Sequence, residues 1–149
     1  MLRTHATTTT TTTAARAVSD AKQGRARALC AAGGVLSAAL AWIVEVPVLG
    51  IHLDFRFGAS HIQTIAAGQV IGVTMAVSLL GWLLLALLER RTSHARLLWT
   101  TIALAAVAAS LALPLAVATS TSAVAGLIIM HLTVGAAVIP AMASTARAC

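Results

Sequence analysis

The sequence predicts an all-α membrane protein: a bundle of four transmembrane helices with both termini in the cytoplasm. Three observations carry this prediction, namely the composition, the spacing of the apolar segments and the placement of the basic residues. Of the 149 residues, 59% are hydrophobic and only 9% are charged, whereas a soluble domain carries about 25% charged residues. The mean hydropathy is +0.93. These apolar residues exceed what a small core can bury, so we expect lipid around them.

The N-terminal segment is polar and of low complexity. It contains seven consecutive threonines, Thr7 to Thr13, and five scattered basic residues. Such a segment buries too little apolar surface to offset the entropy lost on ordering. We therefore expect a disordered cytoplasmic tail over 1–27 and a transmembrane domain over 28–145.

Four apolar segments follow the tail. Each reaches the roughly 20 residues that an α-helix needs to cross a hydrocarbon core of about 30 Å. The first could also be a cleaved signal peptide, but its long leader and the three later spans favour a retained helix. The expected spans are about 28–49, 62–88, 97–118 and 122–143.

Basic residues give the orientation. Nine of the ten lie before the first span, between the second and third, or after the fourth, and only Arg56 lies on the other side. The positive-inside rule then places both termini in the cytoplasm of a multi-pass protein of the plasma (cytoplasmic) membrane. Trp82 and Trp99 fall where an interfacial aromatic belt would lie. Because the basic residues flank apolar runs, we expect no nucleic-acid partner.

Small residues predict how the helices pack, because helices in lipid associate through close backbone approach. The second helix has a Gly-xxx-Gly pair, and we expect Gly72→Leu to disturb its packing more than Leu84→Ala. The contacts could be made within one chain or between copies in a homo-oligomer or with a membrane partner. The expected packing residues are Gly34, Ala38, Ala41, Gly68, Gly72 and Gly135.

One polar group on each helix lies at a similar depth. At ~1.5 Å rise per residue, Glu45, Gln69, Ser110 and His131 fall within a few ångströms of one another along the membrane normal. We expect Glu45 to pair with His131, since an unpaired buried carboxylate would otherwise take up a proton. The pair could lock the bundle, or the four groups could form a solute-binding or proton-responsive site.

The outer loop alternates polar and apolar residues from Ile51 to Phe57, a period-2 pattern. A single strand is not stable alone, so we expect an extended segment on the membrane surface. Its polar residues could cap the Glu45 layer, or Asp54 and Arg56 could simply neutralise each other. A metal site there lacks a recognisable spacing, and Cys30 and Cys149 form no CxxC, so we predict no metal and no cofactor. The candidate outer-loop cap comprises His52, Asp54, Arg56 and His61.

Several stretches together resemble a known family. They are GWLLLALLERR (81–91), LLWTTIALAAVAASLALPL (97–115) and MHLTVGAAVIPAMA (130–143), following the Gly50–Phe57 loop. They are similar to an actinobacterial family of small four-helix membrane proteins known only as a domain of unknown function. The resemblance covers about 28–145 and implies a four-helix integral membrane fold. It implies no activity, ligand or catalytic residue.

The sequence leaves two main functional hypotheses. The first is a non-catalytic packing partner, accessory subunit or envelope component in the lipid bilayer, based on the small-residue stripes and sparse chemistry. The second is a small-solute or proton-linked transporter or sensor that works as an oligomer through Glu45, Gln69, Ser110 and His131. An enzyme is not expected, because the chain lacks paired carboxylates, a nucleophile with its base, and a phosphate-binding loop.

Overall fold

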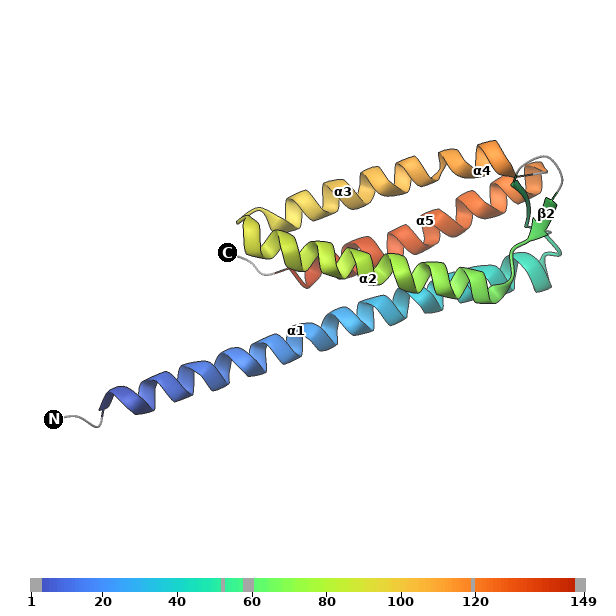
Figure 1. Cartoon of the computed structure of the whole chain (residues 1–149). Helices are drawn as coiled ribbons and strands as arrows, with labels where there is room; N and C mark the ends of the chain where they lie inside the picture. The colour runs from blue at the N-terminus through green and yellow to red at the C-terminus, as the bar shows by residue number, and fades with distance from the viewer. Residues whose placement is uncertain (1–3, 52, 58–60, 119, 147–149) are drawn as a thin grey trace.

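Long apolar helices dominate the structure, a computed structural model that describes residues 4–51, 53–57, 61–118 and 120–146 (Figure 1). Within these residues, four helical segments are long and apolar enough to cross a membrane, which confirms the predicted all-α bundle of four transmembrane helices. The segments are Ala17–Val48, Ala67–Arg91, Ala95–Ala116 and Thr121–Ser144. In order along the chain, the elements are α1 (Thr4–Ile43), η1 (Val44–Val48), β1 (Asp54–Phe57), β2 (His61–Thr64), α2 (Ala67–Arg91), α3 (Ala95–Ser110), α4 (Ala112–Val117) and α5 (Thr121–Ser144).

The four long helices are arranged in a ring in which neighbours run antiparallel. Helix α1 packs against α2 and α5, and α3 packs against the same two helices from the opposite side. Short connections therefore join antiparallel neighbours, as in simple helix bundles. Strands β1 and β2, the end of α4 and the start of α5 share one end, here called the hairpin end (described residues 49–51, 53–57, 61–66, 117, 118 and 120) (Figure 1). The opposite end, here the basic end, carries the α2–α3 turn with Arg90, Arg91 and Arg96.

Helix α1 begins much earlier than the sequence indicated. We expected disorder through residue 27, but α1 is helical from Thr4 and projects beyond the bundle at the basic end (Figure 1). Near the bundle, Gln23 and Arg27 from the expected tail bond to Glu89 and Thr145. These contacts to α2 and α5 order a stretch that composition alone presented as unstructured. In the structure, helix α1 continues through residue 27 without a break.

Two prolines interrupt the helices near the hairpin end. Pro47 has no N–H to donate to Ile43, and the last turn of α1 widens into η1, where Leu49 N bonds to Val44 O at 3.0 Å. Pro114 likewise leaves the carbonyl of Ser110 without its helical donor. This accounts for the break between α3 and α4.

The outer loop forms a β-hairpin, not the lone extended segment that we expected. β1 pairs antiparallel with β2, with Asp54 opposite Thr64 and Phe57 opposite His61. The hydroxyl of Thr64 also donates to Asp54 Oδ1 at 2.6 Å. The partner strand was missed because its residues were assigned to the second span, whereas α2 begins only at Ala67.

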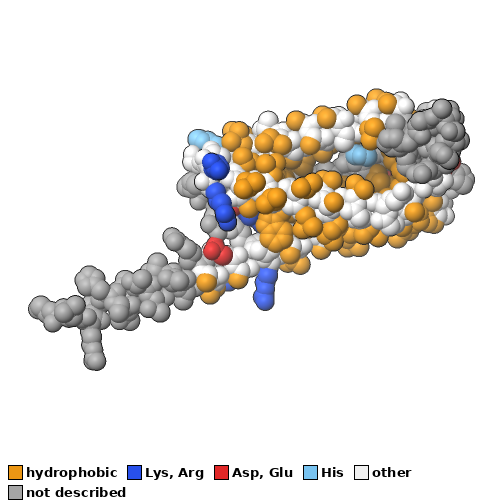
Figure 2. All heavy atoms as spheres, viewed as in Figure 1, with side chains coloured by type: hydrophobic (Ala, Val, Ile, Leu, Met, Phe, Trp, Pro, Cys, Tyr) orange, Lys and Arg blue, Asp and Glu red, His pale blue; other side chains and the backbone are white. Residues whose placement is uncertain are grey.

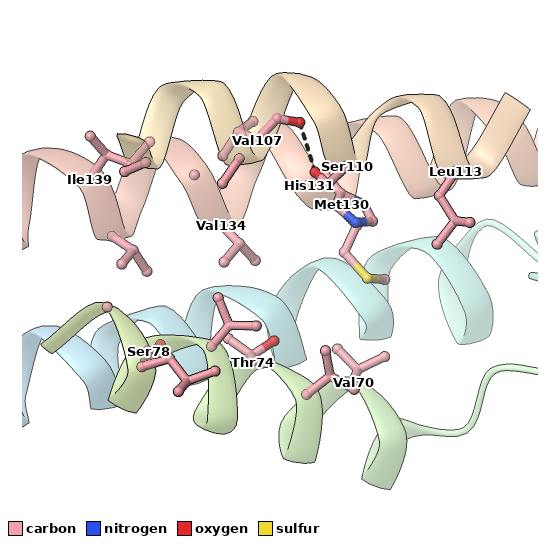
Figure 3. A pocket seen from close by; sticks show the side chains of 18 of the residues that line it. Val70, Thr74, Ser78, Val107, Ser110, Leu113, Met130, His131, Val134 and Ile139 are labelled. Carbon is pink, nitrogen blue, oxygen red and sulfur yellow. Dashed lines mark hydrogen bonds between the residues drawn. The ribbon is translucent and has the colours of Figure 1, made fainter. Parts of the chain in front are cut away.

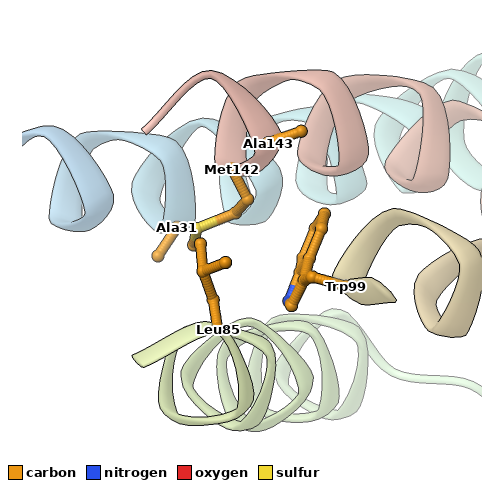
Figure 4. Close-up of a cluster of buried hydrophobic side chains, with 5 residues drawn as sticks. All are labelled: Ala31, Leu85, Trp99, Met142 and Ala143. Atoms are coloured by element: carbon orange, nitrogen blue, oxygen red, sulfur yellow. The ribbon is translucent and has the colours of Figure 1, made fainter. Parts of the chain in front are cut away.

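Two buried clusters hold the ends of the bundle together. At the basic end, side chains from all four helices meet (Figure 4), and Trp99 Nε1 donates to Gly81 O at 2.9 Å. Trp99 is therefore a core residue, although we expected it in an interfacial belt. The basic-end cluster comprises Ala31, Leu85, Trp99, Met142 and Ala143, and the hairpin-end cluster comprises Ala38, Leu53, Val70, Leu127 and Met130.

The predicted packing residues divide into two groups. A Cβ on Gly34 would stand 2.5 Å from Val138 Cγ2, and one on Gly135 would stand 3.2 Å from Val107 Cγ2, so both glycines lie at helix contacts. Ala38 is fully buried in the hairpin-end cluster, and Ala41 packs against that cluster.

Gly68 and Gly72 behave differently. A Cβ on either glycine would meet no described atom within 4 Å. The sequence left open whether these glycines pack within one chain or against another chain. Packing within the chain is therefore wrong for both. Leu84, in contrast, packs against the basic-end cluster. The structure thus reverses the expected order of Gly72→Leu and Leu84→Ala.

Candidate functional site: a lateral cleft

A cleft of about 760 Å³ lies between α2, α3, α4 and α5. Its long axis follows the bundle, because its lining extends from Ile65 at the hairpin end to Trp99 at the basic end. Figure 3 shows Val70, Thr74 and Ser78 of α2 facing Val107, Met130 and Val134 across this space. The volume falls within the range of roughly 300–1,000 Å³ that is usual for small-molecule sites.

The cleft is open along the side of the bundle. Several of its lining residues, including Val73 and Val77 on α2 and Ile102 and Leu113 on α3–α4, are exposed large hydrophobic side chains. Figure 2 shows the corresponding hollow in a face that is rich in hydrophobic side chains. For helices of membrane-spanning length, this opening faces the region that lipid chains would occupy.

Three of the four predicted polar residues line this cleft: Gln69, Ser110 and His131. Each bonds to nearby backbone. Gln69 Oε1 accepts from Ala66 N at 3.1 Å, and Ser110 Oγ donates to Val107 O at 2.7 Å. His131 Nδ1 lies 2.6 Å from Leu127 O, an arrangement that requires the tautomer with the proton on Nδ1. The three residues therefore share one space without bonding to one another.

Glu45 does not belong to the cleft lining. It is 3% exposed, and neither carboxyl oxygen has a hydrogen-bond partner among the described residues. Its Oε2 atom lies 3.2 Å from the point where a Cβ on Gly126 would stand. The expected Glu45–His131 pair is therefore wrong. Glu45 meets α5 at Gly126, five residues before His131, and the imidazole bonds to its own helix.

The outer-loop residues can be placed only in part. Asp54 starts β1 and accepts the bond from Thr64. His52 lies outside the described residues, as do the side chains of Arg56 and His61. Asp54 is thus the one member of the proposed cap whose side chain is described, and it bonds to Thr64. Leu53, an apolar residue of the same loop, is the fully buried one.

Sequence reasoning missed two polar residues of the cleft, Thr74 and Ser78. Both line it from α2, and Ser78 is buried. Together with Val70 and Gly81 they form a stripe spaced four, four and three residues apart, as one helix face requires. The Gly68–Gly72 pair drew attention to another face of α2. The stripe would have been found by testing each face for polar as well as small residues.

The chemistry of the cleft is limited. Its described lining has no carboxylate, thiol or amine, and its hydroxyl-bearing residues are Thr74, Ser78 and Ser110. No group of three or more His, Cys, Asp or Glu residues that could hold a metal ion occurs within the described part of the chain. The arrangement can accommodate an apolar molecule with a few hydrogen-bonding groups. The described lining residues include no pair of groups suited to general acid–base chemistry.

Comparison with known proteins assigns a family without a known activity. Residues 18–148 match the family of unknown function DUF6069, and the chain therefore belongs to this family. The match includes all four membrane-spanning segments except the first residue of the first. Nothing among curated proteins or solved structures matches the chain.

Proposed function

For this member of DUF6069, we propose a non-catalytic accessory role in which the lateral cleft accommodates the apolar chain of a lipid-like molecule. The cleft itself is the observation that carries this proposal. A space of about 760 Å³ lined by side chains such as Val73, Ile102 and Val134 would not stay hydrated in a bilayer. Lipid chains are the apolar molecules that surround its opening.

The polar groups of the cleft favour an apolar occupant. Ser110 and His131 already bond to carbonyl oxygens of their own helices, so they need no polar ligand to satisfy them. The remaining hydrogen-bonding capacity, for example at His131 Nε2, could orient a ligand with a single polar group.

The alternative is a solute or proton-linked transporter with a polar layer at Glu45, Gln69, Ser110 and His131. Support for it is weaker, because Glu45 lies outside the cleft that the other three share. That role would also require an oligomer to form a pathway. The accessory role needs only the cleft of one chain.

The proposal places the protein in the cytoplasmic membrane with both termini in the cytoplasm. This orientation rests on the nine-to-one distribution of Lys and Arg. It puts the basic end among the inner headgroups, and the cleft then spans the hydrocarbon region between the two interfaces.

Native mass spectrometry of the protein released from a mild detergent tests the proposal. The wild type should retain a lipid-sized ligand after delipidation. Ala106→Phe should lower the bound fraction several-fold, because Ala106 lines the cleft. The matched control is Ala105→Phe, since Ala105 is exposed, does not line the cleft and points about 100° away. Equal retention by both variants would contradict the proposal.

A further inference from the structure

Glu45 occupies an enclosed apolar site beside the hairpin end. Both carboxyl oxygens are buried without a hydrogen-bond partner among the described residues. Around the point where a Cβ on Gly126 would stand, Glu45 Oε2 lies at 3.2 Å, Leu53 Cδ2 at 2.9 Å and Ile51 Cγ2 at 3.6 Å. Glycine at position 126 thus leaves the room into which the carboxyl group and Leu53 both fit.

No described charged group compensates a negative charge at this site. On α5, His131 bonds to Leu127 O, and on the hairpin, Asp54 accepts from Thr64. The charged residues of α2 and α3, Glu89, Arg90, Arg91 and Arg96, lie at the basic end, as do those of α1 from Lys22 to Arg27. His52 and the side chains of Arg56 and His61 are outside the described part.

An ionised carboxylate without a partner is strongly disfavoured in such surroundings. A hydrated cation does not fit, because each carboxyl oxygen has less than 1 Å² of accessible surface. A proton is the one ligand that requires no space. The neutral carboxyl group is therefore the form that matches the closed site.

The loop that covers Glu45 is attached to it directly. Ile51 N donates to Glu45 O at 2.9 Å, and Leu53, which is fully buried, bonds through its carbonyl to Ile65 N at 3.1 Å. Gly50 precedes them with φ +65°, a conformation that glycine adopts without strain. Val48 and Leu49 of the same turn are already exposed. Displacement of Ile51 and Leu53 would therefore be enough to let water reach the carboxyl group.

We propose that Glu45 is a proton-binding site and that loss of its proton releases the loop carrying Ile51 and Leu53 from the bundle. The site acts as a latch at the hairpin end that is closed when Glu45 is neutral. It is independent of the cleft occupant, because Glu45 does not line the cleft. Failure of lipid binding would leave the latch intact, and failure of the latch would leave lipid binding intact.

An apolar carbodiimide such as dicyclohexylcarbodiimide tests the proton site, since it reacts with protonated carboxyl groups in apolar surroundings. In detergent-solubilised protein, peptide mass spectrometry should find the adduct on Glu45 at mildly acidic and neutral pH. The yield should fall about tenfold per pH unit once Glu45 ionises. Glu89, paired with Arg27, is the internal comparison and should react much less. No adduct on Glu45 at any pH, or a yield independent of pH, would overturn the proposal.

Thiol labelling tests the loop movement. Two variants, Ile51→Cys and Leu49→Cys, are each made in a background with Cys30→Ser and Cys149→Ser. The measured quantity is the rate of maleimide labelling at position 51 divided by the rate at position 49. Leu49 is exposed, so this ratio corrects for the pH dependence of an exposed thiol, and the Glu45→Gln background controls for the thiol at position 51. With Glu45 present, the ratio should rise about tenfold per pH unit above the ionisation midpoint. With Glu45→Gln, which stays neutral, it should remain flat. The same ratio in both backgrounds at all pH values would contradict the latch.

Discussion

The Nη2 atom of Arg27 lies 2.6 Å from Oε1 of Glu89 and joins α1 to the end of α2 at the basic end. Arg27 is 4% exposed, and its Nε also donates to Thr145 Oγ1 at the end of α5. Gln23 Nε2 donates to Thr145 O at 3.0 Å. These side chains connect three helices where the bundle meets the projecting part of α1. They fix the register of α1 against α2 and α5.

Removal of one partner of this pair should destabilise the bundle strongly. We expect Arg27→Ala to lower the free energy of unfolding by roughly 3 kcal/mol, because Glu89, whose side chain is only 11% exposed, would lose the guanidinium 2.6 Å away. Arg25→Ala is the matched control, since Arg25 is exposed on the same helix. Denaturation in detergent measures both changes. In a double-mutant cycle, Arg27→Ala with Glu89→Ala should cost less than the sum of the single changes. A strictly additive cycle would mean that the pair does not couple the helices.

Adjacent glycines of α1 provide a sharp test of helix packing. Gly34→Ala places a Cβ 2.5 Å from Val138 Cγ2 and should destabilise the bundle by about 1–3 kcal/mol through overpacking. At Gly33, a Cβ meets no described atom within 4 Å. Gly33→Ala should therefore be neutral or stabilise by up to about 1 kcal/mol, because alanine favours the helix. Thermal unfolding of the two variants in one detergent checks the difference. Equal changes would place the α1–α5 contact elsewhere.

On α2, Leu84→Ala should lower the stability more than Gly72→Leu does, which is the reverse of the order that the sequence predicted. Leu84→Ala should destabilise by about 2 kcal/mol, since it removes side-chain atoms that pack against the basic-end cluster. Gly72→Leu should change the stability of the monomer by less than about 1 kcal/mol, because the space beside Gly72 is open. The two melting temperatures, measured on monomeric protein in detergent, give the comparison. A larger loss for Gly72→Leu would show that this face of α2 is packed.

The orientation in the membrane is tested by single cysteines in a background without Cys30 and Cys149. Leu49→Cys at the hairpin end should react with an impermeant thiol reagent added outside intact cells. Ser93→Cys, in the turn between α2 and α3, should react only after the membrane is opened. Both native side chains are exposed, so access across the bilayer, not burial, decides the result. Reaction from outside at position 93 but not at 49 would invert the topology.

The sequence predicted the membrane spans well because apolar length is itself the physical requirement for crossing a bilayer. The depth of Glu45 and His131, which follows from residue count along a helix, stays a prediction. Their pairing failed because it depends on how each helix is rotated about its axis. Glu45 meets Gly126 of α5, about one and a half turns from His131.

The rotation of each helix about its axis is poorly encoded in the sequence, because the lipid is as apolar as the helix interfaces. A stripe of small residues such as Gly68 and Gly72 therefore does not reveal which face is buried. The ordering of α1 before residue 28 depends on Gln23 and Arg27 reaching Glu89 and Thr145, which are more than 60 positions away in the chain. No local pattern reports such contacts.

An experimental electron-density map of the protein crystallised in a lipidic mesophase tests the central claim most directly. The claim is that the space between α2, α3 and α5 is a lipid-accommodating cleft. We predict continuous elongated density that enters between Val77 and Ile102 and lies against Val134, all residues of the cleft lining. A map in which α2 and α3 close against each other, with their own side chains filling the space, would contradict the account.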